Sequence, residues 1–325
     1  MSIILSHTTA RAFHRAPERP DALESFPPRR KAIGAAPVDL ALAGDARLKL
    51  VRYGVPDAAL ARLDVMVAGA ADRRRSPAVA CHVCAAELPA GSLLRLGGGV
   101  FVADVRLTAL QAAVDLDLLE LVEYYFELCG GYELPFDDED DYRERPAPTS
   151  VAELRRFFEA CSRCAGSAKA LRALRFVRDG SRSPMETAAV MTLVLPKRMG
   201  GLGIRGLKMD HRVPVTAHAR RLTRRACLYC DAFLPASRTD IEYHGFFHDG
   251  EERAAEDEER KNALVAMGFE VIALRRWAFF DGRAFERFTA AVCRAARISA
   301  CRLPKGFERD RERLRRFVLR RWLEP

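Results

Sequence analysis

The segment from Ser183 to Leu274 predicts a helix, three strands, a second helix and a final strand, in that order, and this succession restricts the fold more than any other feature. The first helix begins where Ser183 can cap it, where Pro184 suits the first turn and where Glu186 occupies the capping-box position. It is expected to end near Leu195. The segment therefore predicts a mixed α/β (α+β) domain.

The remaining elements of this domain follow from hydrophobic periodicity and turn residues. Strands are expected over residues 202–215, 225–234, 239–243 and 269–274, and the second helix over 250–267, with Gly268 at its end. Beyond them, residues 302–325 predict a basic amphipathic tail helix.

The N-terminal part of the chain predicts a mainly helical region with a small β-element. Helical patterns cover residues 6–15, 40–71, 107–128 and 151–176, and short β-like pieces cover 78–105. The run 137–144 holds six acids and one arginine, which is typical of a solvated linker. We therefore expect an N-terminal region at 1–136, a linker and helical connector at 137–182, the mixed domain at 183–301 and the tail helix at 302–325.

The net charge of the 325-residue chain is +9, from 53 Lys and Arg against 44 Asp and Glu. A basic surface attracts polyanions, although only seven of these cations are lysine, so an arginine-rich composition is an alternative cause. No apolar run is long enough for a membrane-spanning helix, and the N-terminus has no pattern of a secretory signal. We expect a cytoplasmic protein without membrane association.

Cysteines are numerous, nine in total, and three pairs have the spacing Cys-x-x-Cys. These are Cys81 and Cys84, Cys161 and Cys164, and Cys227 and Cys230. The absence of a signal pattern favours free thiols over disulfides. Because two such pairs can close a tetrahedral zinc site, a zinc-stabilised interaction protein stays an alternative hypothesis.

Two acids lie near the ends of consecutive expected strands. Asp231 lies near the end of one strand and Glu242 near the end of the next, with a turn at residues 235–238 between them. If the strands form a hairpin, both carboxylates can reach one edge of the sheet. Paired carboxylates of this kind suit Mg²⁺ or Mn²⁺, which prefer oxygen ligands.

The spacing around these acids resembles the PD-(D/E)XK nuclease superfamily, especially its small endonucleases related to very-short-patch-repair enzymes. The resemblance covers about residues 183–285 and rests on the element order and on Asp231, Glu242-Tyr-His244-Gly-Phe-Phe-His248, Asp257, Arg260, Leu264 and Gly268. It implies a restriction-endonuclease-like fold that hydrolyses DNA phosphodiesters with Mg²⁺ or Mn²⁺ and no small-molecule cofactor. It further implies that Asp231 and Glu242 bind the metal, that Glu186 assists, and that His244 or His248 positions water.

One departure from the family pattern concerns His244, which stands where the superfamily usually has Lys and this branch often has Asp. An imidazole titrates near neutral pH and can orient or deprotonate water. The same departure fits a catalytically inactive DNA-binding regulator or antitoxin-type protein that retains the fold.

Ordinary structural roles also explain each of these positions. Glu186 can act only as a capping-box partner, Asp231 and Glu242 can be solvated strand residues, and His248 can begin the second helix. In that helix, Arg260 can form an ordinary salt bridge beside a core leucine.

The segment from His211 to Cys230 contains arginines but no acid. Such a field can follow phosphates without sequence preference, whereas a solvated loop is the alternative. With the arginine of the second helix, the candidate DNA-binding residues are Arg212, Arg220, Arg221, Arg224, Arg225 and Arg260.

The N-terminal half has a more diffuse resemblance to AbiEi-type antitoxin regions, which occur joined to nuclease-like domains of this kind. It rests on Ser6-His-Thr-Thr-Ala10, the β-element that ends Gly-Gly-Val-Phe-Val, and the helix start at Leu107-Thr108. It implies a partner in a toxin–antitoxin or defence system.

Overall fold

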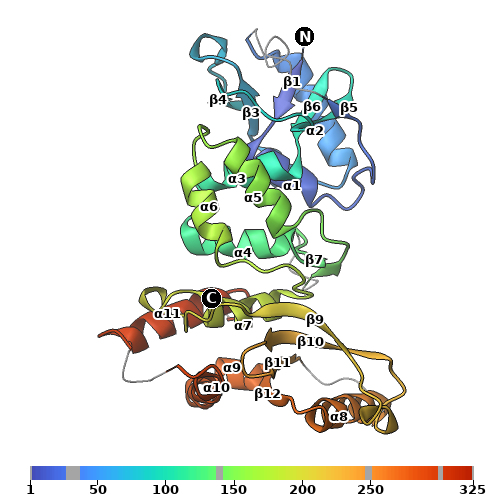
Figure 1. The fold of residues 1–325 in the computed structure, drawn as a ribbon. Helices are drawn as coiled ribbons and strands as arrows, with labels where there is room; N and C mark the ends of the chain where they lie inside the picture. The colour runs from blue at the N-terminus through green and yellow to red at the C-terminus, as the bar shows by residue number, and fades with distance from the viewer. Residues whose placement is uncertain (1, 27–36, 137–141, 246–250, 299–302, 324–325) are drawn as a thin grey trace. The chain divides into compact units, whose positions relative to one another are not determined.

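The computed structural model describes residues 2–26, 37–136, 142–245, 251–298 and 303–323 of a mixed α/β protein. The chain divides into two compact units, Met1–Val177 and Arg178–Pro325 (Figure 1). No described helix is long and apolar enough to cross a membrane.

Unit 1, residues 1–177, is built on a six-stranded sheet with the strand order β2-β5-β6-β1-β3-β4. The central strand β1 runs parallel to β6 and antiparallel to β3. The strands are β1 (Ile3–Leu5), β2 (Ser25–Phe26), β3 (Leu63–Val67), β4 (Val79–Val83), β5 (Leu93–Gly97) and β6 (Val100–Ala103).

Helices complete unit 1, and α3 to α6 pack against one another (Figure 1). The helices are α1 (His7–His14), α2 (Leu40–Arg52), α3 (Val105–Asp115), α4 (Leu118–Leu128), α5 (Val151–Ala160) and α6 (Ser167–Leu174), with 3-10 turns η1 (Asp57–Leu60) and η2 (Ala70–Asp72). A small ladder pairs β7 (Tyr132–Glu133) with β8 (Arg143–Glu144).

The sheet of unit 1 is larger than the sequence pattern indicates. Strand β3 lies within residues 40–71, for which the pattern predicts helix. Its apolar run is short, and periodicity alone does not distinguish such a run from a helix segment. Pairing with β1 and β4 buries four of its five residues and makes it a strand.

Two further boundaries differ from expectation. Residues 107–128 form two helices rather than one, because Asp117 accepts hydrogen bonds from the backbone N–H groups of Leu119 and Glu120 and so starts α4. The division between units follows Val177 and not the acidic run 137–144, since α5 and α6 pack on α3 and α4. Residues 137–141 of that run lie outside the described residues.

Unit 2, residues 178–325, has the expected helix, three strands, helix and strand in order. They are α7 (Pro184–Val194), β9 (Lys208–Pro214), β10 (Cys227–Leu234), β11 (Thr239–His244), α8 (Glu251–Ala266) and β12 (Glu270–Arg275). Shorter turns η3 (Lys197–Met199) and η4 (Ala219–Arg221), and the helices α9 (Arg276–Phe280), α10 (Gly282–Ala295) and α11 (Phe307–Leu319), complete the unit. The last of these is the expected tail helix, and it packs on α7 as part of the unit.

The sheet of unit 2 has the order β12-β11-β10-β9. Its pairs β9–β10 and β10–β11 are antiparallel, whereas β11 and β12 are parallel and joined through α8. One sheet face packs on α8, where Leu264 lies in a cluster with Leu228 and Phe233. The first strand is shorter than expected, since Gly203 and Gly206 have positive φ and extended pairing begins only at Lys208.

Candidate active site

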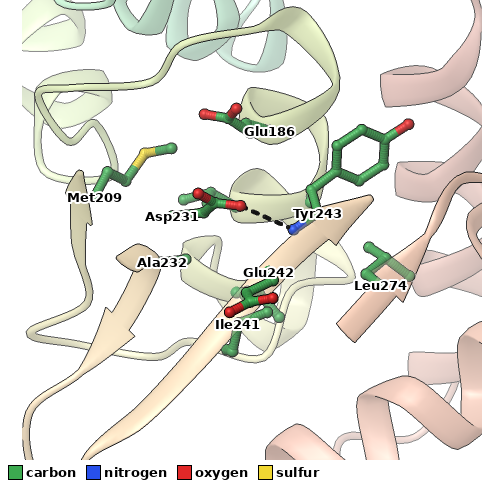
Figure 2. Close-up of a pocket in the computed structure, with 11 residues that line it drawn as sticks. Glu186, Met209, Asp231, Ala232, Ile241, Glu242, Tyr243 and Leu274 are labelled. Carbon is green, nitrogen blue, oxygen red and sulfur yellow. Dashed lines mark hydrogen bonds between the residues drawn. The ribbon is translucent and has the colours of Figure 1, made fainter. Parts of the chain in front are cut away.

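A pocket lies where α7 covers β10 and β11 in unit 2, and an acidic residue from each of these elements is among those that line it. They are Glu186 of α7, Asp231 of β10 and Glu242 of β11 (Figure 2). The pocket is small, with a cavity volume of about 10 Å³, which is room for about one water molecule, and apolar side chains such as Ile241 form most of its lining. Three residues that are far apart in sequence are thus brought together.

Asp231 faces α7 and is held by the neighbouring strand. Its Oδ2 atom accepts a hydrogen bond of 3.2 Å from the backbone N–H of Tyr243 (Figure 2). Burial raises the pKa of Asp231, and the positive charge of Arg260 opposes this only in part. The protein therefore holds this carboxylate in an environment that favours a compensating cation.

Glu186 lies in the first turn of α7, which Ser183 caps by accepting a 3.1 Å hydrogen bond from the Glu186 backbone N–H. Its own Oε2 accepts a 2.8 Å hydrogen bond from the backbone N–H of Arg182, one residue before the cap. Burial, and next the negative charge of Asp231, raise the pKa of Glu186 to about 7. The capping role and a place in the pocket are therefore compatible.

Glu242 is almost completely buried, with 3% of its surface exposed. Its Oε1 lies 2.7 Å from the guanidinium of Arg260, and its Oε2 lies 3.2 Å from Nε2 of His244. Burial alone would raise the pKa of Glu242, but the hydrogen bond from His244 and the charge of Arg260 lower it. Glu242 is therefore ionised and paired.

Asp240 belongs to the same cluster, and the sequence interpretation missed it. It is fully buried two residues before Glu242, and its Oδ2 lies 3.6 Å from Arg260. Burial and the charge of Glu242 raise the pKa of Asp240 to about 8. The available signal was the alternation Asp240, Glu242, His244, because alternate residues of a strand share one face.

Arg260 has a different position from the one expected of a phosphate contact. Its side chain is only 15% exposed, and besides Glu242 it donates a 2.7 Å hydrogen bond to the backbone carbonyl of Tyr229. The ion pair therefore crosses from α8 to β11 beside the buried core residue Leu264. This arrangement supports the salt-bridge interpretation of Arg260.

The other candidate DNA-binding arginines are all exposed. Arg212 lies on β9, Arg220 and Arg221 lie in η4, and Arg224 and Arg225 precede β10. Arg225 forms a 2.7 Å ion pair with Glu256, another exposed residue. This segment presents positive charge to solvent, as phosphate binding requires.

The remaining candidates concern metal ligands. His248 lies outside the described residues. Within the described ranges, no group of three or more His, Cys, Asp or Glu side chains is arranged to hold a metal ion. The eight cysteines of the described part are free thiols, and Cys227 and Cys230 lie in a different unit from the other two Cys-x-x-Cys pairs.

The sequence and the structure were compared with protein-family models, curated proteins and solved structures, and none of them matches this chain.

Proposed function

We propose that unit 2 is a Mg²⁺- or Mn²⁺-dependent endonuclease of the PD-(D/E)XK type that hydrolyses DNA phosphodiester bonds. The observation that carries this proposal is the shared pocket of Glu186, Asp231 and Glu242, which come from three different elements. The element order α7-β9-β10-β11-α8-β12 supports it, since the resemblance implies the same order. A DNA substrate agrees with the cytoplasmic location that we expect from the sequence.

The donor atoms of the pocket suit a hard divalent cation. They are carboxylate oxygens, and burial raises the pKa of both Glu186 and Asp231, so a cation nearby would relieve an unfavourable burial of charge. Mg²⁺ commonly binds through one or two carboxylates and completes its shell with water and substrate phosphate. Asp231 and Glu242 would hold the ion, with Glu186 beside them. The ion would polarise the phosphate and lower the pKa of a bound water.

His244 and Glu242 together can move a proton. If Nε2 of His244 carries the proton, it donates to Oε2 of Glu242, and this contact would fix the orientation of the imidazole. Arg260 fixes Glu242 from the other side. In this proposal His244 would accept a proton from water, and Glu242 would keep the imidazole oriented.

The exposed arginines between β9 and β10 would bind the DNA backbone. Arg220, Arg221 and Arg224 are exposed and stand in a segment without acids. Contacts of this kind position DNA without reading its sequence. The proposal therefore assigns cleavage to the pocket and backbone binding to this segment.

Cleavage of supercoiled plasmid DNA tests the proposal. The wild-type chain should nick plasmid with Mg²⁺ or Mn²⁺ and stop on addition of EDTA, whereas Asp231→Asn and Glu242→Gln should each reduce the rate at least about 100-fold. Exposed Glu256→Gln is the matched control and should cut normally. If wild type and Glu242→Gln are equally inactive although both are folded and bind DNA, the catalytic proposal fails.

A second candidate, a DNA-binding regulator or antitoxin-type protein that does not cut, is favoured by the pairing of Glu242. Both carboxylate oxygens of Glu242 have partners within the protein, Arg260 and His244. A carboxylate whose two oxygens are already paired with protein groups gains less from binding a metal ion. This candidate predicts DNA binding that is indifferent to Mg²⁺, and a partner from a toxin–antitoxin or defence system, as the resemblance of the N-terminal half implies.

A further inference from the structure

Tyr229 presents an aromatic ring to solvent beside the carboxylate pocket. It is 44% exposed and lies on β10 two residues before Asp231. Alternate residues of a strand point to the same side of the sheet, so the ring and the Asp231 carboxylate share the face that α7 partly covers. A large exposed ring next to a candidate active site is a surface that a flat ligand can use.

Two arginines flank this ring. The guanidinium carbon of Arg182 lies 5.7 Å from the ring centroid of Tyr229, and the Arg182 side chain is 62% exposed. Arg182 is held by a 2.8 Å ion pair with Asp210 of β9. Arg212 is exposed and stands opposite Tyr229 in the β9–β10 pairing. Residues opposite one another in an antiparallel pair have neighbouring side chains on one face.

The cluster is also tied to the pocket through the backbone. The N–H of Arg182 donates to Oε2 of Glu186, which lines the pocket together with Asp231. A ligand that contacts Tyr229 and Arg182 would therefore lie next to the carboxylates.

We propose that Arg182, Arg212 and Tyr229 form a platform on which an unpaired base of single-stranded DNA stacks, with its phosphates bound by the two arginines. This inference rests on the proposed function and names its substrate class. Aromatic rings and guanidinium groups together bind single strands, because every base has a π-face and every nucleotide a phosphate. In a duplex the faces of the bases are covered by their neighbours, so a stacking platform selects unpaired strands.

Binding measured in EDTA tests this without reference to cleavage. The full chain is titrated into a fluorescein-labelled single-stranded oligonucleotide and into the duplex of the same sequence, and anisotropy is followed. Wild type should bind the single strand more tightly, and Tyr229→Ala should weaken that binding about ten-fold, the effect of removing one stacked base. Tyr229→Phe keeps the ring and should bind as wild type does.

The arginines and a matched aromatic control complete the experiment. Arg182→Gln and Arg212→Gln should each lower the slope of log affinity against log salt concentration by about 0.7, the value for one phosphate contact to a single strand. Trp277 is 60% exposed on α9, and Trp277→Ala should leave the affinity unchanged. Circular dichroism of each variant verifies its fold.

Three results would overturn the platform: equal affinity for single strand and duplex, wild-type affinity of Tyr229→Ala, or an equal reduction with Trp277→Ala. Any of these results would mean that the Arg182–Tyr229 contact has only a local structural role and does not bind DNA. Because these measurements contain no metal, they are independent of the cleavage assay. A chain that binds through Tyr229 but never cuts would refute the nuclease and retain the platform.

Discussion

Arg260 of α8 and Glu242 of β11 form a buried ion pair at 2.7 Å, and a second buried carboxyl group, Asp240, lies 3.6 Å from the same guanidinium. One cation thus faces two acids that are 0% and 3% exposed. Burial and the charge of Glu242 raise the pKa of Asp240, whereas the hydrogen bond from His244 and the charge of Arg260 lower the pKa of Glu242 against its burial.

Replacing Arg260 by Met should strongly destabilise the protein, because it leaves Glu242 buried without its counter-charge. Removing one partner of a buried pair costs about 3–5 kcal/mol. The difference in melting temperature from wild type should be full above about pH 4.5 and should shrink at lower pH, because the lowered pKa of Glu242 makes the ion pair stabilising only while Glu242 is ionised. Arg225→Ala is the control, since its exposed pair with Glu256 should contribute at most about 1 kcal/mol. Equal melting temperatures of the two variants would contradict the buried pair.

Glu186 predicts a pH dependence of stability. Its pKa is raised from 4.5 to about 7 in the folded protein, so between these values the folded state binds more protons than the unfolded state. Stability from this group is therefore full below about pH 4.5 and is lost as pH rises toward 7. Relative to Glu186→Gln, wild type should lose about 3 kcal/mol across this window. Melting curves of both proteins at several pH values measure the difference, and parallel curves would refute it.

The exposed arginines before β10 predict a salt effect on DNA binding. The triple variant Arg220→Gln, Arg221→Gln and Arg224→Gln should bind duplex DNA more weakly than wild type. The slope of log affinity against log salt concentration should be smaller in magnitude by about 0.9 for each phosphate that an arginine no longer neutralises. The comparison is a triple variant of exposed arginines on α11, Arg309, Arg313 and Arg316, which should keep the wild-type slope. If both triple variants are weakened equally, net charge and not this segment governs binding.

Alanine substitutions at Gly200 and Gly203 test whether α11 packs beside Gly200. Both have positive φ, at 87° and 70°, so alanine is strained at either position. A Cβ at Gly200 would also overlap the backbone of Asp310 in α11, whereas a Cβ at Gly203 meets nothing. Gly203→Ala should cost about 1 kcal/mol from backbone strain alone. Gly200→Ala should cost about 1–3 kcal/mol more from overpacking. Thermal melts with equal destabilisation would mean that α11 does not pack there.

Part of the candidate site could be predicted from the sequence because it depends on local chemistry. Ser183 marks the start of α7, since a serine followed by proline and, three residues on, glutamate is a local capping signal. Asp231 and Glu242 fall on strands because each lies in a short segment rich in apolar residues, and the turn at residues 235–238 separates the two segments. These features need only neighbouring residues to be recognised.

Partners across the sheet could not be predicted in this way. The role of Arg260 depends on α8 packing against β11, and the contact between Arg260 and Asp240 depends on the same packing. The six-stranded sheet of unit 1 is a similar case, because β1 at residues 3–5 pairs with β6 at residues 100–103. A three-residue strand has almost no periodicity of its own.

The order of helices and strands in residues 183–275, the cap of α7 and the exposed arginine segment follow from the sequence, because spacing, caps and turns are properties of neighbouring residues. The pairing of Glu242 with Arg260 and the position of Tyr229 opposite Arg212 are known only from the folded structure. Both contacts depend on strand register and helix packing. These are fixed by the burial of whole faces over long sequence separations, which no local pattern encodes.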